Sequence, residues 1–130
     1  MGRIIAIANQ KGGVGKTTTT INLAACLAEK DQHVLVIDID PQGNTTSGFG
    51  IEKEELENTI YELILGECSL EQCLIKNAVN NLDVLPSNVN LAGAEIDLIG
   101  VEDREYILKN KIRPAAAALK QIIHVGYSVF

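Results

Sequence analysis

Lysine, threonine and glycine gather in one short stretch, residues 10–18, which reads Gln-Lys-Gly-Gly-Val-Gly-Lys-Thr-Thr. Glycine has no Cβ, so a backbone rich in it can turn sharply and point several N–H groups at one anion. Lys16 adds a positive charge, and the hydroxyl of Thr17 is a suitable ligand for Mg²⁺. These residue types in this order predict a cradle for the phosphates of a nucleoside triphosphate.

The segments on either side of this stretch are those that a phosphate cradle requires. An apolar run at residues 4–8 predicts a strand, and a helix-like run extends from Thr19 to Lys30. The apolar residues of this run, many of them alanine, form a stripe at helical spacing, so the helix is expected to be largely buried against the sheet. The start of a helix adds unpaired N–H groups and roughly half a positive charge. A glycine turn without a ligand is therefore the weaker interpretation. The expected nucleotide-binding residues are Lys11, Gly12, Gly13, Val14, Gly15, Lys16, Thr17 and Thr18.

Two carboxylates lie at the end of the next strand-like run, residues 33–38, whose β-branched side chains are typical of a parallel strand covered on both faces. Asp38 and Asp40 then lie at the carboxyl end of a strand, where open α/β sheets bind ligands. Asp40 could orient an attacking water, and Asp38 could hold the loop or support the metal. The alternative is a plain turn, because proline, glycine and asparagine follow.

The glycine stretch departs from the general P-loop pattern, since Gln10 stands where the first glycine would fall and Lys11 is an additional lysine. The form K-G-G-x-G-K-T-T resembles the ParA/MinD group of ATPases. The words D-x-D-P-Q-G-N at 38–44, N-L-D-V-L-P-S at 81–87 and N-L-A-G-A-E-I-D-L at 90–98 narrow the resemblance to the ParA/Soj branch. Proteins of that branch partition chromosomes and plasmids, and the MinD branch differs at 41–44.

The resemblance implies ATP and Mg²⁺ as cofactors and an ATP-dependent homodimer in which Lys11 reaches the partner's nucleotide. It assigns catalytic roles to Asp40, Lys11 and Lys16, places Thr17 and Asp38 at the metal, and maps a switch loop onto residues 40–50. It also implies a ParB-like partner and, in the family, non-specific DNA binding at the nucleoid. The net charge of −6 gives no support for DNA binding by this segment itself.

The fold class expected from these signals is α/β, P-loop NTPase-like, with a mostly parallel sheet flanked by helices and truncated relative to the family. Residues 1–112 correspond to the N-terminal half of a ParA-like domain, and residues 113–130 form a divergent tail. The family's third core strand, which ends in Ile-Asp-Cys-Pro-Pro and lies between the first two, is not matched in full. Residues 121–130 are strand-like and could begin it.

Residues 51–112 are expected to be mainly helical. The expected elements are a helix at 59–66 closed by Gly66, a capping box of Ser69 with Gln72, a short strand at 82–86, a helix at 91–99 capped by Asn90 and a charged helix around 102–111. The cysteines, Cys26, Cys68 and Cys73, are interpreted as small buried apolar residues, His33 as a strand-edge residue and His124 as part of a tail.

Three hypotheses for function remain open from the sequence. The chain is the nucleotide-binding part of a partition ATPase, or a non-catalytic truncated remnant or interaction module, or, with less support, part of a MinD-like cell-division ATPase. These 130 residues alone are expected to show no turnover, because the third strand's carboxylate is missing. No apolar run is long enough to cross a membrane and no signal peptide is evident, so the expected location is the cytoplasm.

Overall fold

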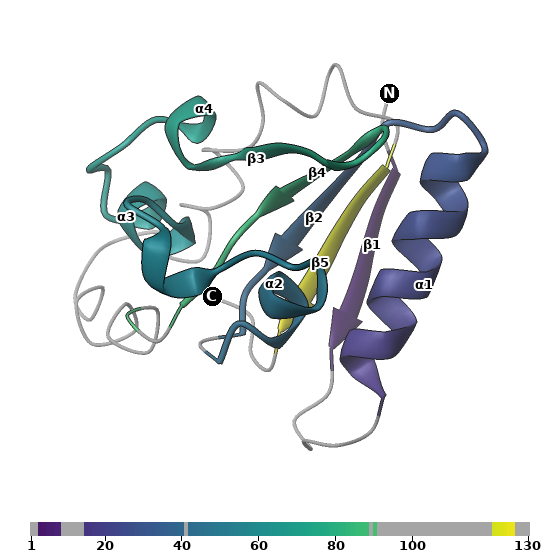
Figure 1. Cartoon of the computed structure of the whole chain (residues 1–130), viewed down its shortest axis with the longest axis horizontal. Coiled ribbons are helices and arrows are strands. Elements are labelled where there is room, and N and C mark those ends of the chain that lie inside the picture. Colours follow the sequence, from purple (N-terminus) through teal and green to yellow (C-terminus); the bar gives the residue numbers. More distant parts are fainter. Residues whose placement is uncertain (1–2, 9–14, 41, 89, 91–120, 127–130) are drawn as a thin grey trace.

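A mixed sheet organises the chain, and the computed structural model describes it through residues 3–8, 15–40, 42–88, 90 and 121–126 (Figure 1). The strands are β1 (Arg3–Ala8), β2 (Val34–Asp38), β3 (Ile75–Val79), β4 (Leu82–Leu85) and β5 (Gln121–Gly126). Their order is β1-β5-β2-β4-β3. The pairs β1–β5, β5–β2 and β2–β4 are parallel and only the β4–β3 pair is antiparallel, which confirms the expected fold class.

Strand β5 occupies the central place between the first two strands of the chain. Ile123 pairs with Ile5 of β1 on one side and with Val36 of β2 on the other. The expectation that β1 and β2 are not direct neighbours is therefore confirmed. His124, interpreted from the sequence as a tail residue, lies instead in this strand opposite Ala6 and Ile37.

Strand β2 is buried along its whole length because helices and loops cover both faces of the sheet. Its Leu35 and Ile37 belong to one apolar cluster with α3 (Ile60–Ile64), and its Val34 and Val36 belong to a second cluster with α1 (Lys16–Glu29). This alternation is the geometry of a strand between two layers, as the continuous apolar run predicted.

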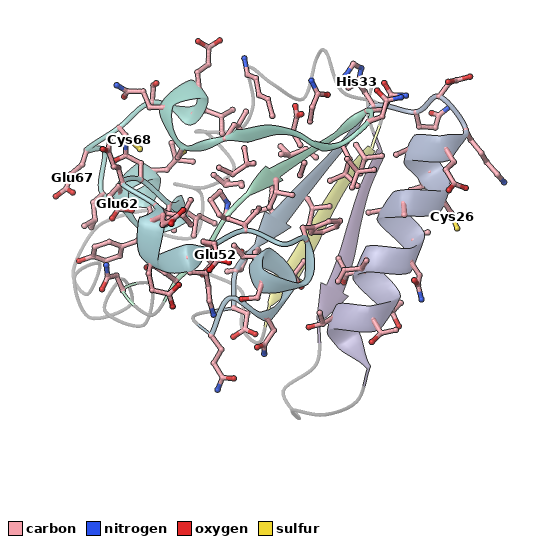
Figure 2. All side chains as sticks on the ribbon, viewed as in Figure 1. Cys26, His33, Glu52, Glu62, Glu67 and Cys68 are labelled. Atoms are coloured by element: carbon pink, nitrogen blue, oxygen red, sulfur yellow. The ribbon has the colours of Figure 1, made fainter. Side chains whose placement is uncertain are left out.

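Helix α1 packs against the sheet through its smallest side chains. Ala24 and Ala28 are buried with the second cluster, and Leu23 and Leu27 are only partly buried beside them. The predicted apolar stripe is confirmed, but the expectation of a largely buried helix is wrong in the described residues. Cys26 is exposed on the outer side of α1 (Figure 2), so its interpretation as a buried residue is corrected.

The segment between β2 and β4 contains short helices, and the described part of the range expected to be mainly helical, residues 51–88, also contains two strands. The short helices are α2 (Asn44–Gly48), a 3₁₀ turn (Lys53–Glu55), α3 and α4 (Leu70–Cys73). The glycine end of α3 is confirmed by Gly66, with φ 79°, and the capping box of Ser69 and Gln72 is confirmed. Strand β3 was not predicted. The helices expected at 91–99 and 102–111 lie outside the described residues.

Cys73 is buried, as expected, and Cys68 is partly buried. Burial raises the pKa of the Cys73 thiol to about 12, with the nearby Cys68 adding to the rise. His33 is exposed immediately before β2, at the end of the strand remote from Asp38 (Figure 2). In the described part of the chain, no helix has the length and apolar character needed to cross a membrane.

Candidate functional site

The carboxyl ends of the four parallel strands meet at one edge of the sheet. Ala8 at the end of β1 pairs with Gly126 at the end of β5, and Asp38 at the end of β2 pairs with Val125. Ile37 pairs with Leu85, the last residue of β4. Ligands of open α/β sheets bind at such an edge. The start of α1, which follows β1, and the residues that the sequence singled out after β2 therefore belong to one region of the molecule.

Helix α1 starts at this edge, and its N-cap residue makes no side-chain hydrogen bond to the first turn. Its N-cap is Gly15, which has φ 81° and, as a glycine, offers no side-chain oxygen to the first N–H groups. A Cβ at Gly15 would meet nothing within 4 Å, so the positive φ, not crowding, favours glycine here. The first turn of this 14-residue helix carries no acidic side chain. Its N–H groups and positive dipole end suit an anion.

Helix α2 lies against the beginning of α1, beside Thr17. A Cβ added at Gly48 would collide with Cδ1 of Ile21 and would lie 3.6 Å from Cγ2 of Thr17. The absence of a side chain at Gly48 thus lets the two helices approach closely. The segment after Asp40 is in this way packed directly on the helix that starts the expected phosphate cradle.

Asp38 is fully buried, and its carboxylate accepts hydrogen bonds from the residues that follow it. Its Oδ1 accepts the Asp40 N–H over 3.0 Å, and its Oδ2 accepts the N–H of Thr46 over 2.9 Å and the hydroxyl of Thr46 over 2.6 Å. Burial raises the pKa of the Asp38 carboxyl, with Asp40 adding to the rise, while these hydrogen bonds oppose it. Of its two expected roles, these contacts support holding the loop; the metal role stays a prediction.

Asp40 is also buried, at 1% exposure, and its carboxylate is oriented by the residues that follow it. The N–H of Gln42 donates to its Oδ1 over 3.0 Å, and the amide of Asn44 donates to its Oδ2 over 3.3 Å. The interpretation as a turn also holds, because the N–H of Gly43 donates to the Asp40 carbonyl over 2.8 Å. The turn is what fixes the carboxylate.

Three residues that sequence reasoning did not assign to the site hold this loop. Thr46 binds Asp38, Ser87 donates its hydroxyl to the Asp40 carbonyl over 2.7 Å, and Lys53 donates from Nζ to the Gln42 carbonyl over 2.6 Å. Ser87 follows the end of β4, so the rule that pointed to Asp38 and Asp40 could have pointed to it as well. Nothing in the local pattern indicates Lys53.

Crowding at Gly43 shows how closely these residues approach. Gly43 has φ 62°, and a Cβ there would lie 2.8 Å from the Ser87 carbonyl oxygen and 2.7 Å from Cδ of Lys53. Only glycine fits such a position without displacing a neighbour.

Some of the remaining predicted residues lie in the described part of the structure, and others do not. Thr17 is partly buried and Thr18 exposed in the first turn of α1, and the backbone of Lys16 starts that helix. Lys11, Gly12, Gly13 and Val14 lie outside the described residues, so their roles stay predictions. Within the described ranges, no group of three or more histidines, cysteines or acidic residues is placed to hold a metal.

The donor set fits Mg²⁺ bound together with nucleotide phosphates rather than a metal held by protein alone. Mg²⁺ usually takes one or two protein oxygens and completes its octahedron with phosphates and water. The hydroxyl of Thr17 is an oxygen of this kind, and it lies in the first turn of α1, after a glycine N-cap that makes no side-chain hydrogen bond. The residues present therefore suit a nucleoside triphosphate with Mg²⁺.

Comparison with known proteins gives consistent matches over nearly the whole chain. Residues 2–124 match the AAA_31 family, described as an AAA domain. Sporulation initiation inhibitor protein Soj of Bacillus subtilis is 51% identical over 121 residues, covering 93% of this chain and 46% of Soj. Chromosome partitioning protein ParA of Myxococcus xanthus is 46% identical over 123 residues, covering 95% of this chain and 44% of ParA.

The fold is similar to that of a solved enzyme with nucleotide bound. Cobyrinic acid a,c-diamide synthase from Mycobacterium smegmatis, with an ATP analogue and magnesium, superposes with a TM-score of 0.92 at 35% identity. The superposition covers 98% of this chain and 52% of that one. The chain therefore spans about half the length of the relatives it matches.

Proposed function

This chain belongs to the AAA_31 family, and from that membership we propose that it is the ATP-binding part of a Mg²⁺-dependent partition ATPase of the ParA/Soj type. The observation that supports the proposal is that the start of α1, with its glycine N-cap, lies at the same sheet edge as Asp38, and that α2, which follows Asp40, packs beside Thr17. The identities of 51% and 46% to Soj and ParA support the partitioning role.

In this proposal the start of α1 binds the phosphates. The N–H groups of its first turn and the ammonium group of Lys16 offset the negative charge, and Thr17 supplies an oxygen to Mg²⁺. The metal, when bound, neutralises charge that develops on the phosphate oxygens. The other predicted cradle residues, Lys11 to Gly15 and Thr18, are assigned to binding the same phosphates.

Asp40 orients the attacking water by accepting its hydrogen bond. Phosphoryl transfer depends on positioning and on charge stabilisation more than on covalent chemistry by the protein. The carboxylate already receives donors from Gln42 and Asn44, so it is held in one orientation before a ligand arrives. Asp38 holds the loop through its hydrogen bonds with Asp40 and Thr46, and it supports the binding of Mg²⁺.

For the intact protein that carries this chain we propose the partners that the family implies. ATP brings two copies together, with Lys11 of each copy reaching the nucleotide of the other, and a ParB-like protein stimulates hydrolysis. The non-specific DNA binding that the family implies is not proposed for these residues, because their net charge is −6. The proposed location is the cytoplasm, at the nucleoid.

A binding experiment on the intact protein tests the proposal. Mg²⁺-ATP at ~100 times its Kd should stabilise the protein by roughly 2.7 kcal/mol, seen as a rise in Tm. Phosphate release should accompany it, and Lys16→Ala should abolish both effects. A wild-type protein whose Tm does not respond to Mg²⁺-ATP would overturn the proposal.

A further inference from the structure

Ser87 joins the end of β4 to both ends of the loop that carries Asp40. Its hydroxyl donates to the Asp40 carbonyl over 2.7 Å, and its N–H donates to the hydroxyl of Thr46 over 3.0 Å. Ser87 is fully buried, although it lies 47 residues from Asp40 and 41 residues from Thr46 in the sequence. Water therefore does not compete for these hydrogen bonds, and both depend on the strand order.

Thr46 closes these contacts into a ring. Its hydroxyl accepts from Ser87 and donates to Asp38, and Asp38 in turn accepts the N–H of Asp40. The carbonyl of Asp40 accepts the hydroxyl of Ser87, which completes the ring. Every member of this ring, Asp38, Asp40, Thr46 and Ser87, is at most 1% exposed. A hydroxyl that donates and accepts at once has only one orientation, so the ring allows little rotation.

The hydrogen bonds of the ring engage the main-chain N–H and carbonyl of Asp40, whereas its carboxylate binds donors outside the ring. The carboxylate oxygens are engaged by Gln42 and Asn44, whereas Ser87 contacts the carbonyl. A change at Ser87 would therefore tilt the peptide that carries the carboxylate without removing any group that contacts it. Displacement of a reacting group by about 1 Å can cost up to 10²-fold in rate.

We propose that Ser87 is a positioning residue for Asp40, which sets the direction of its carboxylate through the ring with Thr46 and Asp38. This inference rests on the proposed function, in which Asp40 orients the attacking water. Ser87 contributes to turnover and not to the binding of nucleotide, because its hydrogen bonds within the described residues are made to Asp40 and Thr46 and not to the start of α1.

Steady-state ATP hydrolysis by the intact protein tests the assignment. Ser87→Ala removes the donor to the Asp40 carbonyl, and kcat should fall by about 10-fold or more while KM for ATP stays within a few-fold. Thr46→Val keeps the shape of the side chain and breaks the ring at its other side, so it should lower kcat similarly. Thr46→Ser keeps the hydroxyl and should retain most of the wild-type kcat.

A matched control separates positioning from a loss of stability. Ser69 caps α4, where its Oγ accepts from the Gln72 N–H over 3.3 Å, so Ser69→Ala also weakens the fold but lies outside the ring. Measured well below the Tm of every variant, Ser69→Ala should keep the wild-type kcat. The double variant of Ser87→Ala with Thr46→Val should lose less than the product of the single losses, because both break one ring.

The outcomes distinguish the two proposals. An unchanged kcat in Ser87→Ala, in a protein that hydrolyses ATP, would overturn the positioning role alone. Equal losses of kcat in Ser87→Ala and Ser69→Ala would also overturn it, since the effect would then follow stability. A wild-type protein that binds no ATP would overturn the proposed function and, with it, this inference.

Discussion

Asp38 accepts two hydrogen bonds from Thr46, one from the main-chain N–H over 2.9 Å and one from the hydroxyl over 2.6 Å. The neighbouring Thr45 is equally buried, yet its hydroxyl finds no partner among the described residues. The hydroxyl groups of these two adjacent threonines are therefore used differently. The contrast offers an internal measure of what the link between β2 and α2 contributes to stability.

Thr46→Val should lower the free energy of unfolding by about 1–3 kcal/mol, because it leaves the Ser87 N–H without an acceptor and removes a donor from buried Asp38. Thr45→Val should cause no loss, since it removes a buried hydroxyl that has no partner in the part of the chain that the structure describes. Urea unfolding of both variants measures the difference. Equal losses in the two variants would show that the ring does not stabilise the loop.

Gly43→Ala should destabilise the protein more than Gly50→Ala. Both glycines have positive φ, 62° and 80°, so each substitution costs about 1–2 kcal/mol in backbone conformation. Only at Gly43 does the added Cβ crowd a neighbour, at 2.8 Å from the Ser87 carbonyl oxygen, whereas nothing lies within 4 Å at Gly50. The extra loss should be at least about 1 kcal/mol. Denaturant unfolding of both variants measures the difference in stability. Equal losses of stability in Gly43→Ala and Gly50→Ala would contradict the tight packing around Gly43.

Lys11 and Lys16 should fail in different ways when replaced in the intact protein. Lys16→Ala removes the charge on the protein's own phosphates and should abolish ATP binding. Lys11→Ala should spare much of the binding by the monomer but remove ATP-dependent dimerisation and hydrolysis. Light scattering with and without ATP separates the two. A Lys11→Ala protein that still dimerises on ATP would rule out a role across the dimer.

Much of the fold was predictable because its signals are local. The apolar run of β2, the small-residue stripe of α1 and the capping box of Ser69 each depend on neighbours within one or two turns. Strand β3 escaped prediction because its pairing is irregular. Its Asn77 has φ 52°, and its hairpin turns through Asn81 with φ 66°, so the alternation of a regular strand is interrupted.

The ring around Asp40 could not be predicted from sequence spacing. Asp38 and Asp40 were found because each follows a recognisable strand, but their link to Ser87 depends on β4 lying next to β2 in the sheet. Strand order is a property of the whole fold, and no local pattern encodes it. Lys53 contacts Gln42 although α2 lies between them in the sequence, and no local pattern indicates this contact.

The most direct test of the central claim is the turnover and ATP affinity of Asp40→Ala in the intact protein. Asp83→Ala is the matched control, because Asp83 holds the β3–β4 hairpin by accepting the Asn77 N–H over 2.9 Å and lies outside the ring. If Asp40 orients water, its replacement should reduce kcat by about 10² or more while ATP affinity stays within a few-fold, and the control should keep both values. An equally large loss of ATP binding would place Asp40 at the metal, and an unchanged kcat would remove it from the reaction; either result would contradict the account.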